Sequence, residues 1–382
     1  MSQYKTLFTK PYLSGKEKEY ISKALDKKQL SGNGTYTKKC QNFFEERYKI
    51  KKALLTTSCT DALEMASLLL EIKPGDEVIM PSYTFVSTAN AFVLRGAKII
   101  FCDSRADHPG MDEDKIEDLI TAKTKAIIPV HYAGMACDME KIMSLAEKHS
   151  LFVVEDAAQA IENYYTFSNG EKKALGSIGH LATFSFHETK NISCGEGGLL
   201  AINDERFISR AEILWEKGTN RASFYRGEVN KYGWVDLGSS FLPSEYTAAF
   251  LWAQLEELED IQRKRIELWN FYHQKLSQKE IFFQMPTLVP YSGNNAHIYY
   301  IIMNSLAHRD KLIESFKEQH ILAVFHYQSL HKSKYFLSQK GEQVSLPNCE
   351  RYSDQLLRLP LFYDLTEGEQ LRIIEVLLKE SN

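Results

Sequence analysis

The chain has 382 residues, of which 44% are hydrophobic and 25% charged, and its formal net charge is −4. This length exceeds the usual size of one hydrophobic core, so a large domain over residues 1–243 and a smaller one over residues 244–382 are expected. The near-neutral charge argues against a strong electrostatic attraction to nucleic acid or to an anionic membrane. The six cysteines are widely spaced, without the clustering that zinc requires, so no metal site is predicted.

The chain shows no sign of a membrane or secreted protein. Its apolar runs are shorter than the roughly 18 residues that span a bilayer, and the first five residues lack a secretory pattern. A cytoplasmic location is therefore expected.

Two helices are predicted first, over residues 14–29, where Ser14 and Glu17 form a capping box, and over residues 37–47. From there to about residue 203, short apolar runs alternate with helical segments. This alternation predicts an α/β fold with a mostly parallel seven-stranded sheet and helices on both faces, because parallel strands need crossover helices. The expected strands are residues 53–56, 77–80, 98–101, 126–130, 152–155, 183–186 and 199–202.

The remainder of the chain predicts a small α+β domain. Residues 217–243 are rich in Gly, Arg and Tyr and are expected to form an irregular functional loop. A long helix over residues 244–278 would then bridge the two domains. The other expected elements are strands near residues 297–303 and 322–325 and helices near residues 309–319 and 367–379.

The apolar run 151–154 ends in Glu155 and Asp156. In a parallel sheet, an acid at the carboxyl end of a strand faces the edge where ligands bind. A carboxylate there can keep the pyridine nitrogen of pyridoxal 5′-phosphate (PLP) protonated, so that the ring accepts electrons. When this segment is taken alone, capping of the next helix or metal binding by both acids is the more common explanation.

Lys190 follows the next predicted strand. A lysine at an apolar sheet edge can have a lowered pKa, bind PLP as a Schiff base and carry a proton. Most lysines are solvated surface residues, so this interpretation depends on the pairing of Lys190 with Asp156.

Three further junctions between strands and helices suit a cofactor. Ser58 and Thr60 lie where a helix begins and can contact a phosphate, and Ser185 offers another hydroxyl. An aromatic side chain in residues 81–85 can stack on a pyridine ring. Ordinary helix capping and core packing explain these residues as well.

Four segments together resemble the DegT/DnrJ/EryC1/StrS family of nucleotide-sugar aminotransferases, a branch of the fold-type I PLP enzymes. They are residues 74–85, 129–134, 155–159 and 185–191 with 195–198, and the resemblance spans about residues 15–362. It implies that Lys190 is the catalytic residue and binds the cofactor. It further implies that Asp156 pairs with the pyridine nitrogen and that Gln159 contacts the ring hydroxyl.

The resemblance also assigns the remaining cofactor contacts. Thr60, Asp61 and Ser185 would contact the phosphate, and Phe85 would stack on the ring. Many members place an asparagine of the partner subunit on the phosphate. This contact implies a homodimer whose active site lies at the subunit interface. The chain departs from the family pattern in that stretch and has Ser240, which would take the asparagine's role.

Within the family, the chain is most similar to transaminases that make dTDP-4-amino-4,6-dideoxygalactose for enterobacterial common antigen. Residues 82–97, 184–190, 216–221, 323–327 and 357–363 carry this similarity. It implies that L-glutamate and dTDP-4-dehydro-6-deoxyglucose are the substrates and that 2-oxoglutarate is the second product.

Several side chains are candidates for substrate contacts. A diphosphate calls for fixed cations, which Arg221, Arg226 and Lys231 can supply, although surface charges of a loop explain them too. His187 and His326 lie in segments that can approach the site, with ordinary hydrogen bonding as the alternative.

Other functions fit less well. An aminotransferase of the same family that uses a 3-keto sugar, or a GDP- or UDP-linked 4-keto sugar, remains an alternative. The related sugar 3-dehydratases have a histidine in place of Lys190. A nicotinamide dehydrogenase needs G-x-G-x-x-G after a strand, whereas Gly32 and Gly34 follow a helix and Thr37 stands where the third glycine belongs. A binding protein without catalysis would have no reason to keep Asp156, Gln159 and Lys190 together.

Overall fold

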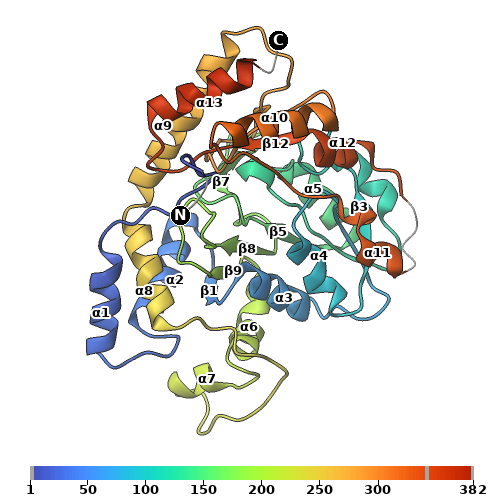
Figure 1. Cartoon of the computed structure of the whole chain (residues 1–382). Coiled ribbons are helices and arrows are strands. Elements are labelled where there is room, and N and C mark those ends of the chain that lie inside the picture. Colours follow the sequence, from blue (N-terminus) through green and yellow to red (C-terminus); the bar gives the residue numbers. More distant parts are fainter. Residues whose placement is uncertain (1–3, 340–343, 380–382) are drawn as a thin grey trace.

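The computed structural model describes residues 4–339 and 344–379. The predicted domains, residues 1–243 and 244–382, therefore include some residues outside the described part. The main feature of the structure is a seven-stranded sheet in the order β1-β9-β8-β5-β4-β2-β3 (Figure 1). Strands β8, β5, β4, β2 and β3 are parallel, and β9 runs antiparallel between β1 and β8. The bounds are β1 (Lys52–Thr56), β2 (Glu77–Pro81), β3 (Lys98–Cys102), β4 (Thr124–Ile127), β5 (Phe152–Asp156), β8 (Leu181–Ser185) and β9 (Gly198–Ile202). The predicted mostly parallel α/β fold is confirmed.

Helices cover both faces of this sheet, because successive residues of a strand point to opposite faces. Ala53 and Leu55 of β1 belong to a core with α2 (Thr35–Tyr48), α5 (Met139–His149) and α8 (Glu245–Glu256). Leu54 belongs to the opposite core with α3 (Cys59–Leu69), α4 (Val86–Val93) and α6 (Ile208–Trp215). Helix α1 (Glu17–Asp26) packs on the outside of α8 (Figure 1).

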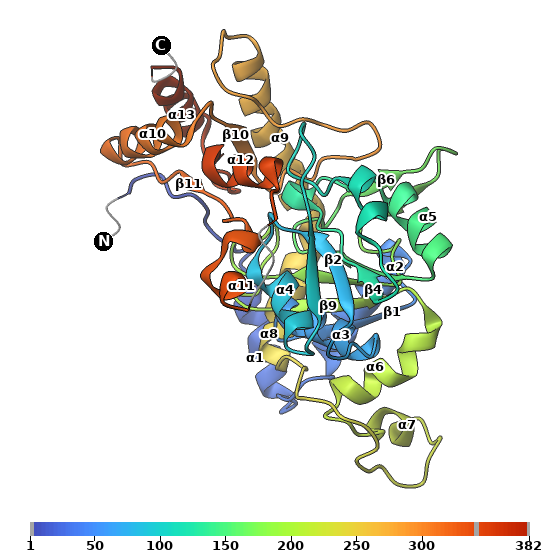
Figure 2. The same ribbon diagram turned by 90° about the vertical axis from the view of Figure 1, so that its right-hand side faces the viewer.

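A second, three-stranded sheet has the order β10-β12-β11 and is antiparallel (Figure 2). Its strands are β10 (Tyr299–Ile302), β11 (Val324–Phe325) and β12 (Leu356–Leu359), of which β12 has no counterpart among the predicted strands. One face packs against α9 (Leu258–Ser277), α10 (Leu306–Glu318) and α13 (Glu367–Lys379). The other face shares a core with the large sheet. The boundary between residues 243 and 244 stays a prediction.

The long helix expected over residues 244–278 is divided. Helix α8 ends at Glu256, α9 begins at Leu258, and Glu257 between them has φ −105° and ψ 7°. Apolar side chains are buried at helical spacing in both helices, so the sequence pattern did not reveal the break. The expected irregular segment 217–243 contains one short helix, α7 (Arg221–Tyr225), and projects away from both sheets in Figures 1 and 2.

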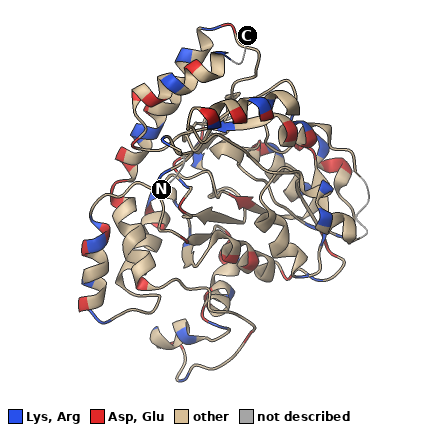
Figure 3. Cartoon of the chain, in the orientation of Figure 1, with Lys and Arg blue, Asp and Glu red and all other residues tan. Residues whose placement is uncertain are grey.

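The remaining strands and α-helices add to the two cores of the large sheet or lie on the surface. They are the hairpin β6 (Tyr164–Thr166) and β7 (Lys172–Ala174), and the helices α11 (Lys334–Ser338) and α12 (Pro347–Gln355). Acidic and basic side chains are interspersed on the outer helices (Figure 3). The six cysteines are all free thiols. None of the described helices combines the length and the apolar character that a bilayer span needs.

Candidate active site

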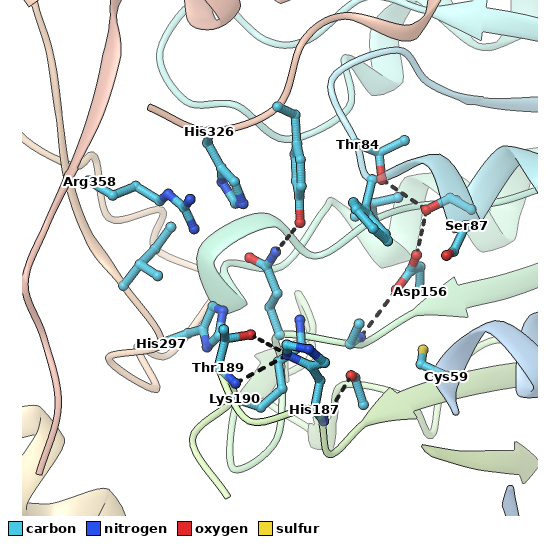
Figure 4. A pocket seen from close by; sticks show the side chains of 18 of the residues that line it. Cys59, Thr84, Ser87, Asp156, His187, Thr189, Lys190, His297, His326 and Arg358 are labelled. Atoms are coloured by element: carbon cyan, nitrogen blue, oxygen red, sulfur yellow. Dashed lines mark hydrogen bonds between the residues drawn. The ribbon is translucent and has the colours of Figure 1, made fainter. Parts of the chain in front are cut away.

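A cavity of about 730 Å³ lies between the carboxyl ends of the large-sheet strands and the second sheet. This volume is in the range of small-molecule sites. Asp156 and Ser185 line it from the last residues of β5 and β8. His326 and Arg358 line it from the side of the second sheet (Figure 4).

Lys190 lies in the turn that follows β8 and lines this cavity. Its backbone N–H donates to the carbonyl of His187 at 2.9 Å, which fixes the turn. Burial lowers the pKa of the Lys190 amine, and the charge of Arg358 acts in the same direction, while Asp156 opposes it. More of the amine is therefore neutral than in an exposed lysine, and the neutral form attacks carbonyl carbons.

Asp156 presents a buried carboxylate to the cavity and is 5% exposed. One oxygen accepts a hydrogen bond from the Thr88 hydroxyl at 2.7 Å, and the other accepts from the backbone N–H of Ala158 at 3.2 Å. Within the described residues no lysine or arginine forms an ion pair with Asp156. The carboxylate thus keeps its charge available for a cationic group in the cavity.

The first turns of α3 and α4 meet beside the cavity. Ser58 caps α3, where its Oγ accepts from the backbone N–H of Asp61 at 3.1 Å. Thr60 Oγ1 donates to Ser87 Oγ at 2.8 Å, and Ser87 lies in the first turn of α4. Helix amino termini with hydroxyl side chains are favourable positions for a phosphate.

Gly198 allows α3 to begin this close to the sheet. It pairs with Thr56 of β1 and with Ser185 of β8. A Cβ atom at position 198 would lie 2.3 Å from the backbone nitrogen of Cys59 and 2.3 Å from the carbonyl carbon of Ser58. Any larger residue would therefore push the start of α3 away from β9.

Gln159 connects the two sides of the cavity. Its Nε2 donates to the Tyr327 hydroxyl at 2.9 Å, and its Oε1 accepts from the backbone N–H of Ala133 at 2.7 Å. Phe85, which precedes α4, has its ring 6.1 Å from the Tyr327 ring and is 55% exposed. An exposed aromatic ring beside a cavity is available for stacking on a planar ligand.

Three histidines line the cavity. His187 Nδ1 lies 3.0 Å from Thr189 Oγ1. His326 stacks on Tyr327, with ring centroids 3.6 Å apart, and its Nδ1 is 2.6 Å from the Tyr132 hydroxyl. His297 Nδ1 is 2.8 Å from the Asn191 side-chain oxygen. Burial lowers the pKa of His326 and of His297 well below the usual value, so both rings are neutral at pH 7.

Arg358 lies in the middle of β12. Its neighbours Leu357 and Leu359 belong to the core of the second sheet, so Arg358 points to the opposite side and lines the cavity. Its Nη2 donates to the carbonyl of Phe325 at 3.0 Å, and its guanidinium lies 4.5 Å from the centre of the Phe8 ring. Its Nε is buried without a hydrogen-bond partner.

The structure brings most predicted site residues together. Those that line the cavity are Thr60, Phe85, Asp156, Gln159, Ser185, His187, Lys190 and His326. Asp61, Ser240, Arg221, Arg226 and Lys231 are not among the lining residues.

The five predicted site residues that do not line the cavity lie elsewhere in the fold. Asp61 uses its carboxylate to accept a hydrogen bond from the Thr57 hydroxyl. Arg226 pairs with Glu212 at 2.8 Å and with Glu228 at 2.7 Å. Arg221 and Lys231 share with Arg226 the projecting part of segment 217–243. Ser240 lies where the segment returns to the fold and pairs with Glu216.

Sequence reasoning did not single out many of the lining residues, among them Thr88, His297, Tyr327 and Arg358. Thr88 lies one turn into α4, where an apolar pattern hides it. The other three come from the second sheet or its flanks, and their distance from Lys190 depends on how two sheets pack. The only available signal was that Tyr327 and Arg358 fall in segments that carry the family resemblance.

These residues fit PLP. Lys190 supplies an amine with a lowered pKa, and the start of α3 supplies donors for a phosphate. Asp156 supplies an anion that forms no ion pair with any lysine or arginine in the described part of the chain. The close approach at Gly198 is what places those donors beside the cavity. In the described part of the chain, no group of three or more His, Cys, Asp and Glu side chains is arranged to hold a metal ion.

Known proteins match over nearly the full chain. The spore coat polysaccharide biosynthesis protein SpsC of Bacillus subtilis (strain 168) is 31% identical over 381 residues, which cover 96% of this chain and 95% of that protein. The protein MJ1066 of Methanocaldococcus jannaschii is 30% identical, over 97% of both chains.

Solved structures show the same architecture. DesV of S. venezuelae superposes with a TM-score of 0.86 and 28% identity, over 96% of this chain and 95% of that chain. PseC of Helicobacter pylori, an aminotransferase of pseudoaminic acid biosynthesis, has a TM-score of 0.88 and 25% identity, over 98% of both chains. The sugar aminotransferase Spr1654 of Streptococcus pneumoniae in its PLP form, with a TM-score of 0.89, 24% identity and coverage of 98% of both chains, supports the fold.

The sequence of one protein family matches residues 11–378, which is almost the whole chain. The match thereby includes the Lys190 turn, the end of β5, the start of α3 and Arg358. The chain belongs to the DegT/DnrJ/EryC1/StrS aminotransferase family and is a PLP-dependent sugar aminotransferase.

Proposed function

We propose that the protein transfers the amino group of L-glutamate to carbon 4 of dTDP-4-dehydro-6-deoxyglucose. The products are 2-oxoglutarate and dTDP-4-amino-4,6-dideoxygalactose, a precursor for surface polysaccharide such as enterobacterial common antigen or O-antigen. We further propose that the enzyme acts in the cytoplasm as a homodimer.

The observation that carries this proposal is where the similar segments lie. Five segments resemble transaminases that act on this sugar, and four of them, residues 82–97, 184–190, 323–327 and 357–363, contribute lining residues to the one cavity that contains Lys190. Similarity concentrated around a cavity supports a shared substrate. The names of SpsC and PseC, which refer to spore coat polysaccharide and to pseudoaminic acid, support a role in making surface sugars.

The chain's own residues have separate tasks in this reaction. Bound PLP supplies an electron sink for the carbanion that forms when an α-proton leaves. Lys190 binds the cofactor, and its freed amine then removes the donor's α-proton and later delivers a proton to the sugar carbon. Asp156 holds the pyridine nitrogen in its protonated form, and Phe85 and Gln159 orient the ring.

Hydroxyl groups and the start of α3 hold the cofactor in place. Thr60 and Ser185 contact the phosphate, and Gly198 sets the distance between them. The face from which Lys190 delivers its proton decides whether the new amine is axial or equatorial. His326 and Tyr327, which follow β11, line the same cavity.

The projecting segment supports the homodimer. It exposes Tyr225, Tyr232, Trp234, Val235 and Leu237, of which Trp234 is 84% exposed. A cluster of exposed aromatic and apolar side chains is typical of a protein interface. We propose that this segment lies on the partner subunit, where Ser240 contacts the phosphate and Arg221, Arg226 and Lys231 bind the nucleotide diphosphate.

Product analysis tests the substrate. The protein is incubated with PLP, L-glutamate and dTDP-4-dehydro-6-deoxyglucose, and the product is assigned by mass and by NMR. We expect one new axial amine at carbon 4 together with stoichiometric 2-oxoglutarate. Parallel reactions with a 3-keto isomer and with the GDP- and UDP-linked 4-keto sugars give the comparison. Faster conversion of any of these would refute the proposed acceptor and leave the aminotransferase class unchanged.

A further inference from the structure

Arg358 is a cation inside the cavity that lacks an acidic partner. Among the described residues no aspartate or glutamate forms an ion pair with it, and its one protein hydrogen bond in the cavity wall is to the carbonyl of Phe325. Burial lowers the pKa of the guanidinium, which nevertheless stays charged at pH 7. Arg358 is partly buried and its Nε is fully buried, and an arginine in such surroundings is rarely left unpaired in a folded protein. The arrangement therefore calls for an anion from outside the chain.

The arrangement of the unpaired N–H groups of the Arg358 guanidinium indicates which anion it can bind. The Phe8 ring covers one face of the guanidinium at 4.5 Å, so a ligand approaches along its edge. Nε is buried without a partner, and within the described residues Nη1 has no hydrogen bond either, so the guanidinium keeps donors that the chain does not use. Two parallel N–H groups in one plane match the two oxygens of a carboxylate.

The position of Arg358 distinguishes the anionic groups of the two substrates. Arg358 and Lys190 line the same cavity, together with His297 and His326 (Figure 4). The α-carboxylate of an amino acid is bonded to the carbon that Lys190 deprotonates, so it must lie close to Lys190. The diphosphate of a 4-keto sugar is attached across the sugar ring from carbon 4 and lies farther away.

We infer that Arg358 binds the α-carboxylate of the amino donor and thereby selects α-amino acids over simple amines. This inference rests on the proposed function only in taking L-glutamate as the donor. Lys190 then acts on the α-carbon and Arg358 binds the carboxylate bonded to it, while the Phe8 ring packs on the guanidinium. The keto sugar, which has no carboxylate at its reacting carbon, does not need Arg358 in this role.

The test separates the two half-reactions. PLP-loaded wild type, Arg358→Gln and Arg358→Lys are mixed with donor in the absence of sugar, and the change in cofactor absorbance gives kcat/KM. The donors are L-glutamate, L-2-aminobutyrate, which lacks the side-chain carboxylate, and 4-aminobutyrate, which lacks the α-carboxylate. Titration with 2-methyl-L-glutamate, which has no α-proton, gives a dissociation constant independent of turnover. Arg263→Gln, a change at an exposed arginine of α9, is the matched control.

For Arg358→Gln we expect kcat/KM to fall roughly 100-fold for L-glutamate and for L-2-aminobutyrate and to change less than 3-fold for 4-aminobutyrate. Weaker binding of 2-methyl-L-glutamate should accompany this loss. Arg358→Lys should lie between wild type and Arg358→Gln, because lysine keeps the charge and loses the planar pair of donors. The half-reaction of the aminated enzyme with keto sugar should be unchanged.

An equal fall of kcat/KM with 4-aminobutyrate would overturn the inference. A fall confined to the half-reaction with keto sugar would also overturn it, because Arg358 would then bind the phosphates of the sugar. A variant that no longer binds PLP is replaced by Arg358→Lys for the same comparison. A wild type that accepts another α-amino acid but not L-glutamate contradicts only the proposed donor. A wild type that accepts no α-amino acid contradicts both proposals.

Discussion

Replacing Gly198 by alanine tests whether the close approach of α3 to β9 builds the phosphate site. The added methyl carbon would lie 2.3 Å from two backbone atoms at the start of α3. Non-bonded heavy atoms prefer separations of about 3.5–4.0 Å, so the first turn of α3 must move by roughly 1 Å. Backbone atoms cannot rotate away as a flexible side chain would. Overpacking of this kind costs about 1–3 kcal/mol.

The displaced helix turn carries Ser58 and Thr60, so the change should weaken PLP binding as well as stability. We expect the PLP dissociation constant of Gly198→Ala to rise about 10-fold or more, because 1.4 kcal/mol corresponds to a factor of ten. Apoenzyme is titrated with PLP and followed by absorbance, and unfolding by urea is measured without cofactor.

Gly368→Ala is the matched control, because nothing lies within 4 Å of a Cβ at this position in the first turn of α13. Alanine in a helix is favoured over glycine, so this variant should bind PLP like wild type and be unchanged or slightly more stable. If Gly198→Ala bound PLP within 2-fold of wild type and kept the wild-type urea midpoint, the explanation of the phosphate site would be wrong.

Three more changes test other parts of the site and fold. Lys190→Ala should lose turnover by at least about 1,000-fold and should no longer fix the cofactor on treatment with borohydride; retained covalent labelling, seen by mass spectrometry, would identify another lysine as the anchor. In apoenzyme, the rate of covalent PLP capture should rise with pH and reach half its maximum below pH 10.5, because burial lowers the pKa of Lys190. Asp156→Asn removes a charge that raises this pKa, so its midpoint should move to lower pH, and an upward shift would contradict the sign. Glu245→Ala should lower the free energy of unfolding in urea by about 2–4 kcal/mol, because the buried carboxylate accepts from the N–H groups of Gly34, Tyr36 and Thr37 at the start of α2; a loss below 1 kcal/mol would show that water replaces it.

The large sheet could be predicted because each of its strands is specified by residues that are neighbours in the sequence. Each strand of a buried parallel sheet is a short apolar run followed by a helix, and an acid such as Asp156 at the end of such a run must face the ligand edge. Lys190 and Asp156 could therefore be placed together from order alone. The break at Glu257 escaped prediction because apolar spacing continues through both α8 and α9.

The cavity wall that the second sheet contributes could not be predicted in the same way. Arg358 enters the cavity because Leu357 and Leu359 pack on α9 and α13, and this depends on contacts between elements far apart in the chain. Arg221 and Lys231 were expected near a diphosphate from their charge alone. Charge does not reveal the direction in which an irregular segment leaves the fold, and segment 217–243 leads away from this cavity.

The free cysteines affect how this enzyme withstands reactive chemicals. Cys59 lines the cavity, and burial raises the pKa of its thiol to about 12. Burial likewise raises the thiol pKa of Cys40, Cys102, Cys137, Cys194 and Cys349. Because thiolates, not thiols, attack electrophiles, the protonated Cys59 does not compete with Lys190 for the aldehyde of the cofactor. The same protonation makes all six side chains slow to react with iodoacetamide or peroxide, so the folded enzyme should keep its activity in air without added reductant.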